Sequence, residues 1–206
     1  MILTVLLALA ISTSQRMFPV HAETQWTYSA TVRWTEEKTN RVREKRMEWR
    51  SRIVDAKSNR DRSVMIIEGF PADLSWYQPD QPLQYTVVVE DDKEVRIGRG
   101  TTLDRAREIA AGALEGAFDG DTVLRHPAKK GDCIRDPDID ERSDKLYAWC
   151  VEDRLPHNGW TITYRSNPSH EILDLTPGKG LTRFVYEHHG TVASAKVRLV
   201  KIRVAK

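Results

Sequence analysis

A run of acidic residues in the second half of the chain has the spacing of a cation-binding loop. Its members are Asp136, Asp138, Asp140 and Asp144. Alternate carboxylates can converge on one hard cation, so this run is a candidate calcium site. An EF-hand loop requires Gly at its sharp turn and Glu at its last position, where this chain has Glu141 and Tyr147. The competing interpretation is a solvated surface loop, and we expect no metal or other cofactor.

The two cysteines have a spacing that favours a disulfide. Cys133 and Cys150 lie far apart in sequence, and neither belongs to a C-x-x-C pair of the kind that binds zinc or performs redox chemistry. Two cysteines in an exported chain usually pair, because the compartment is oxidising. A bridge here would stabilise the fold by roughly 3 kcal/mol, because it reduces the conformational entropy of the unfolded chain. We therefore predict a structural disulfide between them.

Catalytic motifs fail on their spacing. His188 and His189 are adjacent and would point to opposite faces of a strand, and His126, His157 and His170 lie near Pro or Gly in expected loops. The segment 177–180, Pro-Gly-Lys-Gly, lacks the P-loop pattern and predicts a tight turn. No G-x-S-x-G or H-E-x-x-H motif is present. We expect a protein that is not an enzyme, with a hydrolase site assembled from distant residues as an alternative.

Aromatic residues offer a binding chemistry instead. Four of the six tryptophans lie in expected strands: Trp26, Trp34, Trp49 and Trp149. Such rings either fill the core or line a pocket for an apolar ligand on a curved sheet. Trp76 and Tyr77 lie in a Pro-rich loop and are candidate ligand-facing residues. These residues predict binding of an apolar small molecule or an envelope protein, through the concave face or the loop. The alternative is a structural or interaction module of the cell envelope.

The first residues of the chain have the features of a secretory signal peptide. The segment from Ile2 to Ile11 is apolar except for Thr4, and Val20-His21-Ala22 matches a cleavage site. We predict a signal peptide over 1–22 and a single domain over 23–206. An N-terminal membrane anchor is the alternative, but the apolar run has half of the roughly 20 residues that a spanning helix needs. We expect a soluble secreted or periplasmic protein without a transmembrane span.

The charge balance disfavours nucleic acid as a partner. Lys and Arg total 32 and Asp and Glu total 30, which gives a formal net charge of +2. Basic clusters contain acidic neighbours, as a solvated surface does. A nearly neutral protein has no long-range field to attract a polyanion, so we expect no nucleic-acid binding.

Alternation of apolar and polar residues predicts most of the fold. The segments 26–34 and 47–53 alternate with a period of two, which predicts successive antiparallel strands joined by the polar connection 36–44. Further strands are predicted over 64–67, 85–90, 94–97, 146–151, 160–164, 171–175, 181–188 and 191–204. The last two meet at His189 and Gly190, which suit a tight hairpin.

A single amphipathic helix is predicted over about 102–118. Its apolar residues share one face, its charged residues share the other, and Thr101 or Thr102 can cap it. The fold class is mainly β, with a minor α+β character. We expect an antiparallel β-barrel, open or partly closed, or a curved sheet, with the helix packed against it.

Three stretches of the C-terminal half resemble one group of bacterial proteins. They read LRHPAKKGD from Leu124, LYAWCVED from Leu146 and TPGKGLTRFVYEHHGTVASAKVRLV from Thr176. Here a Pro-then-Gly element precedes a Tyr-x-Trp strand, and a Pro-Gly-x-Gly turn leads into the closing hairpin. This order is similar to that in exported bacterial β-rich proteins that have no assigned activity. The resemblance implies a periplasmic or secreted setting and a sheet that closes at the C terminus, and it implies no site residue.

Overall fold

A computed structural model describes residues 16–36, 38–74, 81–135, 139, 143–189 and 193–205. Within these residues the chain forms twelve antiparallel strands and one α-helix. The strands are β1 (Gln25–Glu36), β2 (Arg41–Ser58), β3 (Arg62–Glu68), β4 (Tyr85–Asp91), β5 (Glu94–Thr101), β6 (Asp121–Arg125), β7 (Cys133–Arg135), β8 (Ala148–Leu155), β9 (Gly159–Arg165), β10 (Ser169–Thr176), β11 (Gly180–His188) and β12 (Ala193–Arg203). The helix is α1 (Leu103–Leu114), and short 3-10 turns are η1 (Pro71–Asp73) and η3 (Pro156–Asn158).

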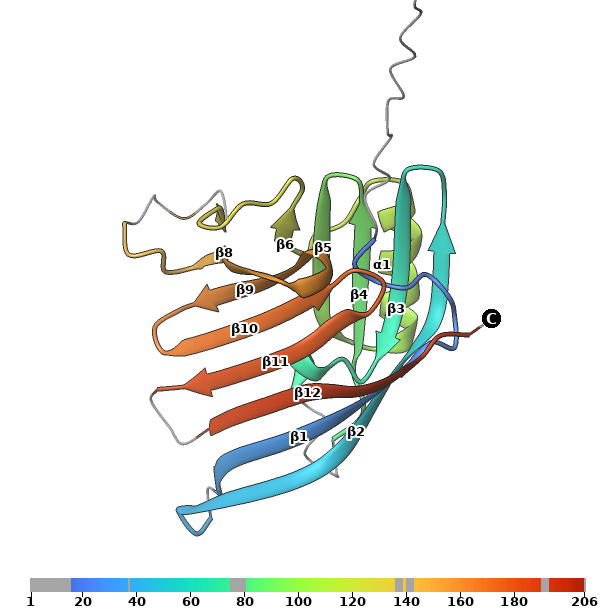
Figure 1. Ribbon diagram of the computed structural model, residues 1–206. Helices are drawn as coiled ribbons and strands as arrows, with labels where there is room; N and C mark the ends of the chain where they lie inside the picture. The colour runs from blue at the N-terminus through green and yellow to red at the C-terminus, as the bar shows by residue number, and fades with distance from the viewer. Residues whose placement is uncertain are drawn as a thin grey trace, which may run out of the picture.

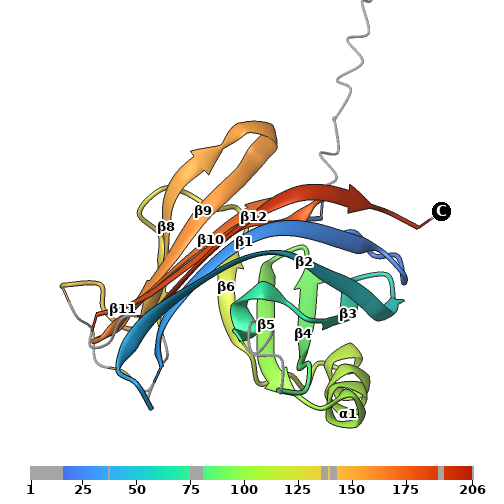
Figure 2. The same cartoon turned by 90° about the horizontal axis from the view of Figure 1, so that it is seen from below.

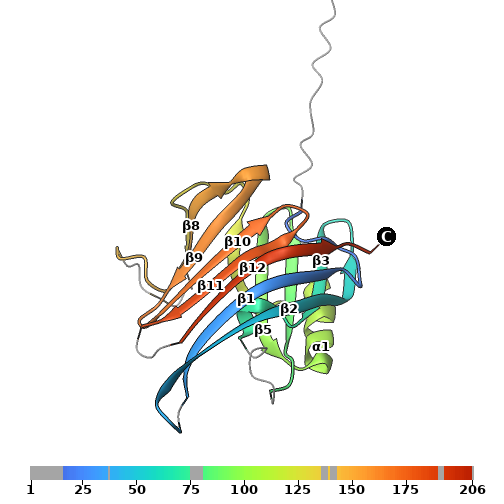
Figure 3. The same ribbon diagram turned by 60° about the horizontal axis from the view of Figure 1, so that its bottom comes forward.

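All twelve strands belong to one sheet that curls into a nearly closed barrel. The strand order is β6-β5-β4-β3-β2-β1-β12-β11-β10-β9-β8-β7, so β1 joins the N-terminal strands to the C-terminal ones (Figures 1 and 3). Each strand otherwise pairs with its neighbour in the chain. The two edge strands are therefore β6 and β7. The predicted fold class, an antiparallel and partly closed barrel with one helix, is confirmed.

Large apolar side chains fill the inside of this sheet. Trp26, Tyr28 and Phe184 are each at most 2% exposed, and Ile162 and Leu173 are completely buried. Trp49 is partly buried and its indole N–H donates to the Gly69 carbonyl at 2.7 Å. The apolar residues of the alternating pattern that predicts these strands thus face inward and form the core. The strand tryptophans act mainly as core residues, which was the first of their two predicted roles.

The helix covers the outer face of β3 and β4 (Figure 2). Its contact face consists of small residues, Ala106, Ala110 and Ala113, which let the helix approach the valine and isoleucine side chains of the sheet closely. Its Thr102 cap is confirmed, because the Thr102 hydroxyl accepts the Arg105 N–H. The predicted end near residue 118 is wrong. The helix stops at Leu114, and Gly116 follows with a φ of +106°, a conformation that favours glycine.

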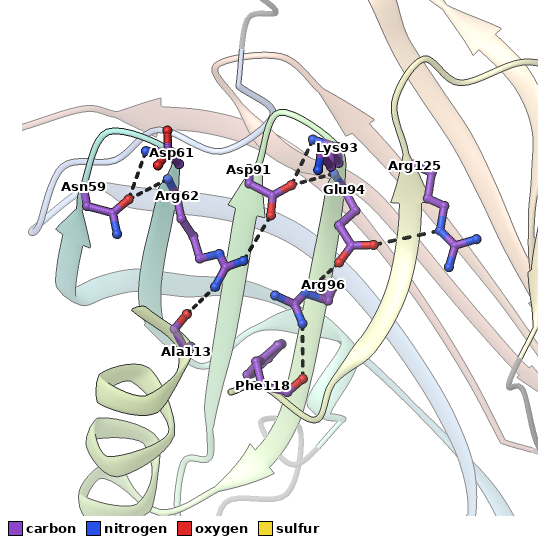
Figure 4. A network of polar contacts seen from close by, with 10 residues as sticks. All are labelled: Asn59, Asp61, Arg62, Asp91, Lys93, Glu94, Arg96, Ala113, Phe118 and Arg125. Carbon is purple, nitrogen blue, oxygen red and sulfur yellow. Dashed lines mark hydrogen bonds and ion pairs between the residues drawn. The ribbon is translucent and has the colours of Figure 1, made fainter. Parts of the chain in front are cut away.

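A network of charged residues fixes the end of α1 to the sheet (Figure 4). The Arg62 guanidinium donates to the Ala113 carbonyl at 2.8 Å and lies 3.5 Å from the Asp91 carboxylate. Arg96 pairs with Glu94 at 3.1 Å and stacks over the Phe118 ring at 5.3 Å. A cation at the last carbonyls of a helix also complements its dipole. The network therefore has a structural role.

Several local predictions differ from the structure. The strands β6 and β7 were not predicted, because each is too short to show an alternating pattern. His170 lies in strand β10 and not in a loop. Strand β2 begins at Arg41, so its connection to β1 is much shorter than the predicted 36–44. The turn at 177–180 between β10 and β11 is confirmed, whereas part of the predicted hairpin at 189–190 lies outside the described residues.

Candidate functional site

The residues selected from the sequence have different outcomes. The disulfide between Cys133 and Cys150 is confirmed, and it joins β7 to β8 at positions that lie opposite each other. Trp76 and Tyr77 lie outside the described residues, as do Asp136, Asp138 and Asp140. Asp144 is described, and its carboxylate accepts the Leu146 N–H at 3.1 Å, as in a turn. The calcium site and the ligand-facing loop therefore stay predictions.

A cleft lies at the seam of the barrel, where the two edge strands face each other. Strand β6 lies beside β7 and β8, and the sheet has no hydrogen-bonded pairing between β6 and either strand (Figure 1). The cleft has a volume of ≈ 460 Å³, which lies within the range of roughly 300–1,000 Å³ that is typical of small-molecule sites. Its lining residues are Asp119, Gly120, Asp121, Thr122, Arg125, Ile134, Arg135, Ile139, Tyr147, Trp149 and Tyr164. We call this the seam cleft.

Aromatic rings form the inner wall of the seam cleft. Trp149 of β8 and Tyr164 of β9 are opposite each other in register, with ring centroids 5.1 Å apart and planes tilted by 40°. The Trp149 ring is mostly buried, and the Arg99 guanidinium stacks on it at 5.4 Å from the centroid. Tyr164 is more accessible than Trp149, as is Tyr147. The tyrosines therefore supply the ring surface that a ligand could contact.

The charged residues of the seam cleft balance one another. Asp119 and Asp121 lie on the β6 side together with Arg125, and Arg135 lies at the end of β7. Arg125 is 3.9 Å from Glu94, and the Arg125 side chain is largely exposed. Because two carboxylates accompany two guanidinium groups, the cleft has no dominant charge. It favours neither a strong anion nor a strong cation.

Behind the aromatic wall lies an ion pair that spans the interior. The Arg99 guanidinium of β5 donates to the Glu171 carboxylate of β10 at 2.7 Å, and the side chains are 20% and 17% exposed. Glu171 is opposite Tyr164 in register, so the ion pair, Tyr164 and Trp149 form one connected group. This group fixes the orientation of the rings that line the cleft.

The half-buried carboxyl group of Asp73, near Arg99, has a raised pKa. Asp73 of η1 accepts hydrogen bonds from the Thr86 hydroxyl at 3.0 and 2.8 Å, and burial raises its pKa to about 6, against opposing effects of Thr86, Arg99 and the Gly100 N–H. A carboxyl group with such a pKa could exchange protons near neutral pH. Asp73 is absent from the lining of the seam cleft, however, so the described geometry gives it no substrate to act on.

The seam cleft could not be predicted from the sequence. Its β6 wall belongs to a strand that was not predicted, and its aromatic wall combines two strands that alternation alone cannot place together. One usable pattern was present. Arg99 lies on the same inward-facing side of β5 as Val95 and Ile97. Glu171 lies on the same inward-facing side of β10 as Leu173. A charged residue in the buried phase of a strand needs a partner, and here the two residues are partners.

Comparisons with known proteins give a resemblance at the level of the fold. No known protein family matches this chain, and no curated protein matches it. One similar solved structure is an inferred lipoprotein from Parabacteroides distasonis, with 9% identity, a TM-score of 0.40 and coverage of 92% of this chain and 99% of that chain. Another is an inferred exported protein with a YmcC-like fold from Bacteroides fragilis, with 10% identity, a TM-score of 0.42 and the same coverage of 92% and 99%.

One of these proteins is named as a lipoprotein and the other as an exported protein, and neither name states an activity. Across the part of the chain that the structure describes, no helix is long and apolar enough to cross a membrane.

Proposed function

We propose that this chain is an exported binding protein without catalytic activity, and that the seam cleft binds an uncharged ligand rich in hydroxyl groups, such as a short glycan. The single observation that carries the proposal is the lining of the cleft. Accessible tyrosine rings stand on one wall, and hydrogen-bonding side chains of both charges surround them. Aromatic faces accept the C–H faces of a sugar ring, and Asp, Arg and Thr side chains bind its hydroxyl groups.

The size and charge of the cleft support this class of ligand. A volume of ≈ 460 Å³ suits a ligand of one to a few rings. Balanced charges would leave a phosphate or an ammonium group next to a side chain of its own sign. An apolar ligand, which the sequence also favoured, is less well supported, because the concave face is filled by side chains such as Phe184 and Leu173. Export is supported by the N-terminal apolar segment and by the disulfide.

Calorimetric titration of the purified protein with cellobiose, maltose and chitobiose tests the proposal. We expect Tyr164→Ala to weaken binding at least about tenfold, since it removes a ring that the ligand contacts. Asp121 is exposed, so the Asp121→Asn variant should fold normally. We expect it to weaken binding about threefold, because it weakens one hydrogen bond to the ligand. Tyr85→Ala is the matched control, because Tyr85 packs beside α1 on the outer face. Equal losses in the Tyr164 and Tyr85 variants would contradict the assignment of the cleft.

The hydrolase alternative, with a site assembled from distant residues, would need a carboxyl group such as that of Asp73, whose pKa burial raises to about 6 but which lies outside the lining of the seam cleft. The same titration separates it from the binding proposal. A disaccharide that is bound and recovered intact supports a binding protein. Release of monosaccharides that is lost in Asp73→Asn supports the hydrolase.

A further inference from the structure

The segment that precedes β1 is an integral part of the core. Figure 1 shows it in blue, near β3 and β4. Met17 and Phe18 are 3% and 1% exposed, which makes them as buried as the strand residues around them. The Phe18 ring lies 6.4 Å from the Phe70 ring. These residues belong to the predicted signal peptide over 1–22, so a segment that was predicted to be removed on export lies in the core.

Hydrogen bonds fix this segment to two separate parts of the sheet. The two oxygens of the Glu90 carboxylate accept the N–H groups of Met17 at 2.5 Å and Phe18 at 3.0 Å. On the other side, Gly178 donates to the Arg16 carbonyl and Gly180 donates to the Met17 carbonyl, both at 2.8 Å. The segment therefore bridges β4 and the turn between β10 and β11.

Gly180 shows how closely the segment fits. A Cβ atom at this position would lie 2.7 Å from Cδ1 of Phe18, closer than atoms can approach, and the φ of Gly180 is +71°. Gly180 is thus required by the local backbone, and its lack of a side chain provides the space that Phe18 occupies.

Glu90 shows what the protein would lose without the segment. Its side chain is buried, at 1% exposure, and its hydrogen bonds to the described residues come from the Met17 and Phe18 amides. Burial raises the pKa of Glu90, and the two amides oppose that rise. Removing the amides would leave a carboxyl group beside an emptied part of the core, which is destabilising in either protonation state.

We infer that export processing cuts this chain before Arg16, so that residues 16–22 belong to the mature protein. Small residues suitable for a cut are present there: Ser12 and Ser14 stand at the third and the first position before Gln15, directly after the apolar run. A cut after Ala22 would remove Met17 and Phe18 and the hydrogen bonds of Glu90. The inference is independent of the ligand proposed for the seam cleft.

Processing is tested directly by exporting the full chain, with a C-terminal affinity tag, from a bacterial host. Intact mass and N-terminal sequencing of the purified product identify its first residue. We expect a first residue between Thr13 and Arg16, with Gln15 preferred. A folded product that begins at Glu23, or one that keeps Met1, would overturn the inference.

Two variants test the structural role of the segment separately from processing. Phe18→Ala should lower the melting temperature by about 10 °C, since it empties a large core position. His21→Ala is the matched control, because His21 is exposed, and it should change the melting temperature by less than about 2 °C. Equal effects of the two substitutions would contradict the packing of the segment in the core.

A cycle between Glu90 and the segment completes the test. In a form that begins at Gln15, Glu90→Gln should lower the melting temperature, because the glutamine NH2 group cannot accept a hydrogen bond and leaves one of the Met17 and Phe18 N–H groups unpaired. In a form that begins at Glu23 the same substitution should leave it unchanged or raise it, since the amides are absent. An equal decrease in both forms would overturn the inference.

Discussion

Arg99 and Glu171 form a 2.7 Å ion pair across the interior of the sheet, although their strands, β5 and β10, are separated by six others in the strand order. Such a contact is possible only because the sheet curls until its inner face meets itself. The pair lies directly behind Trp149 and beside Tyr164. It therefore connects the closure of the barrel to the wall of the seam cleft.

Breaking this ion pair should destabilise the protein more than breaking an exposed one. We expect Arg99→Met and Glu171→Gln each to lower the free energy of unfolding by about 2 kcal/mol, because each leaves its partner unpaired in a partly buried site. The double variant should cost about 1 kcal/mol less than the sum of the two, as measured by chemical denaturation. Arg105 and Glu108 on α1 are the control pair, 2.8 Å apart with side chains 65% and 66% exposed. Their coupling should be below about 0.5 kcal/mol. Similar couplings for the two pairs would contradict this account.

Removing the disulfide should destabilise the fold and open the seam cleft. The bridge closes a loop with a sequence separation of 17, and replacing both cysteines by serine should cost about 3 kcal/mol in unfolding free energy. β7 pairs only with β8 in this sheet and has three residues, so it depends on the bridge for its position. Arg135 and Ile134 would move with it. Glycan affinity should therefore fall in the serine variant while the far-ultraviolet circular dichroism stays that of a β protein. Unchanged affinity would show that β7 does not shape the site.

Asp73 should make the protein less stable as the pH rises from about 4 to 7. Its pKa is raised from 3.8 to about 6 in the folded protein, so the folded state holds a proton that the unfolded state has lost. The stability that this proton confers is fully present below pH 3.8 and is lost as the pH rises through about 6. We expect Asp73→Asn to remove roughly 1–2 kcal/mol of this dependence, after allowance for solvent screening.

Thermal unfolding of the wild type and the Asp73 variant across this pH range provides the measurement. Glu90 also has a raised pKa and contributes in the same direction, so the comparison must be made between the two proteins and not against a flat line. Parallel curves for both proteins would contradict the role of Asp73.

The strands and the helix could be predicted from sequence because their side chains alternate between core and solvent. Trp26 to Trp34 shows this over most of β1, and the alanine face of α1 shows it for a helix. The end of α1 could not be placed as well, because Gly116 could be read as a weak helix residue or as a terminating one. In the structure Gly116 has a positive φ, and the helix ends before it.

The candidate site was largely inaccessible to sequence reasoning for a different reason. Its residues come from strands β6 to β9 and from the segments that flank them, and their proximity depends on how far the sheet curls. Periodicity assigns a side chain to a face but does not say which distant strand faces it. Arg99, Glu171 and Glu90 are charged residues at inward-facing positions that are otherwise apolar. Each of them has a specific partner in the structure.

A chemical-shift titration tests the central claim, glycan binding in the seam cleft, most directly. Isotope-labelled mature protein would be titrated with cellobiose, chitobiose and maltose. We expect saturable shifts at Tyr147, Trp149, Tyr164 and the neighbouring amides of β6, with a Kd of about 1 mM or lower for at least one disaccharide. These shifts should be lost in Tyr164→Ala and kept in Tyr85→Ala. An absence of shifts with every disaccharide, or shifts that lie on the outer face beside α1, would contradict glycan binding in the seam cleft.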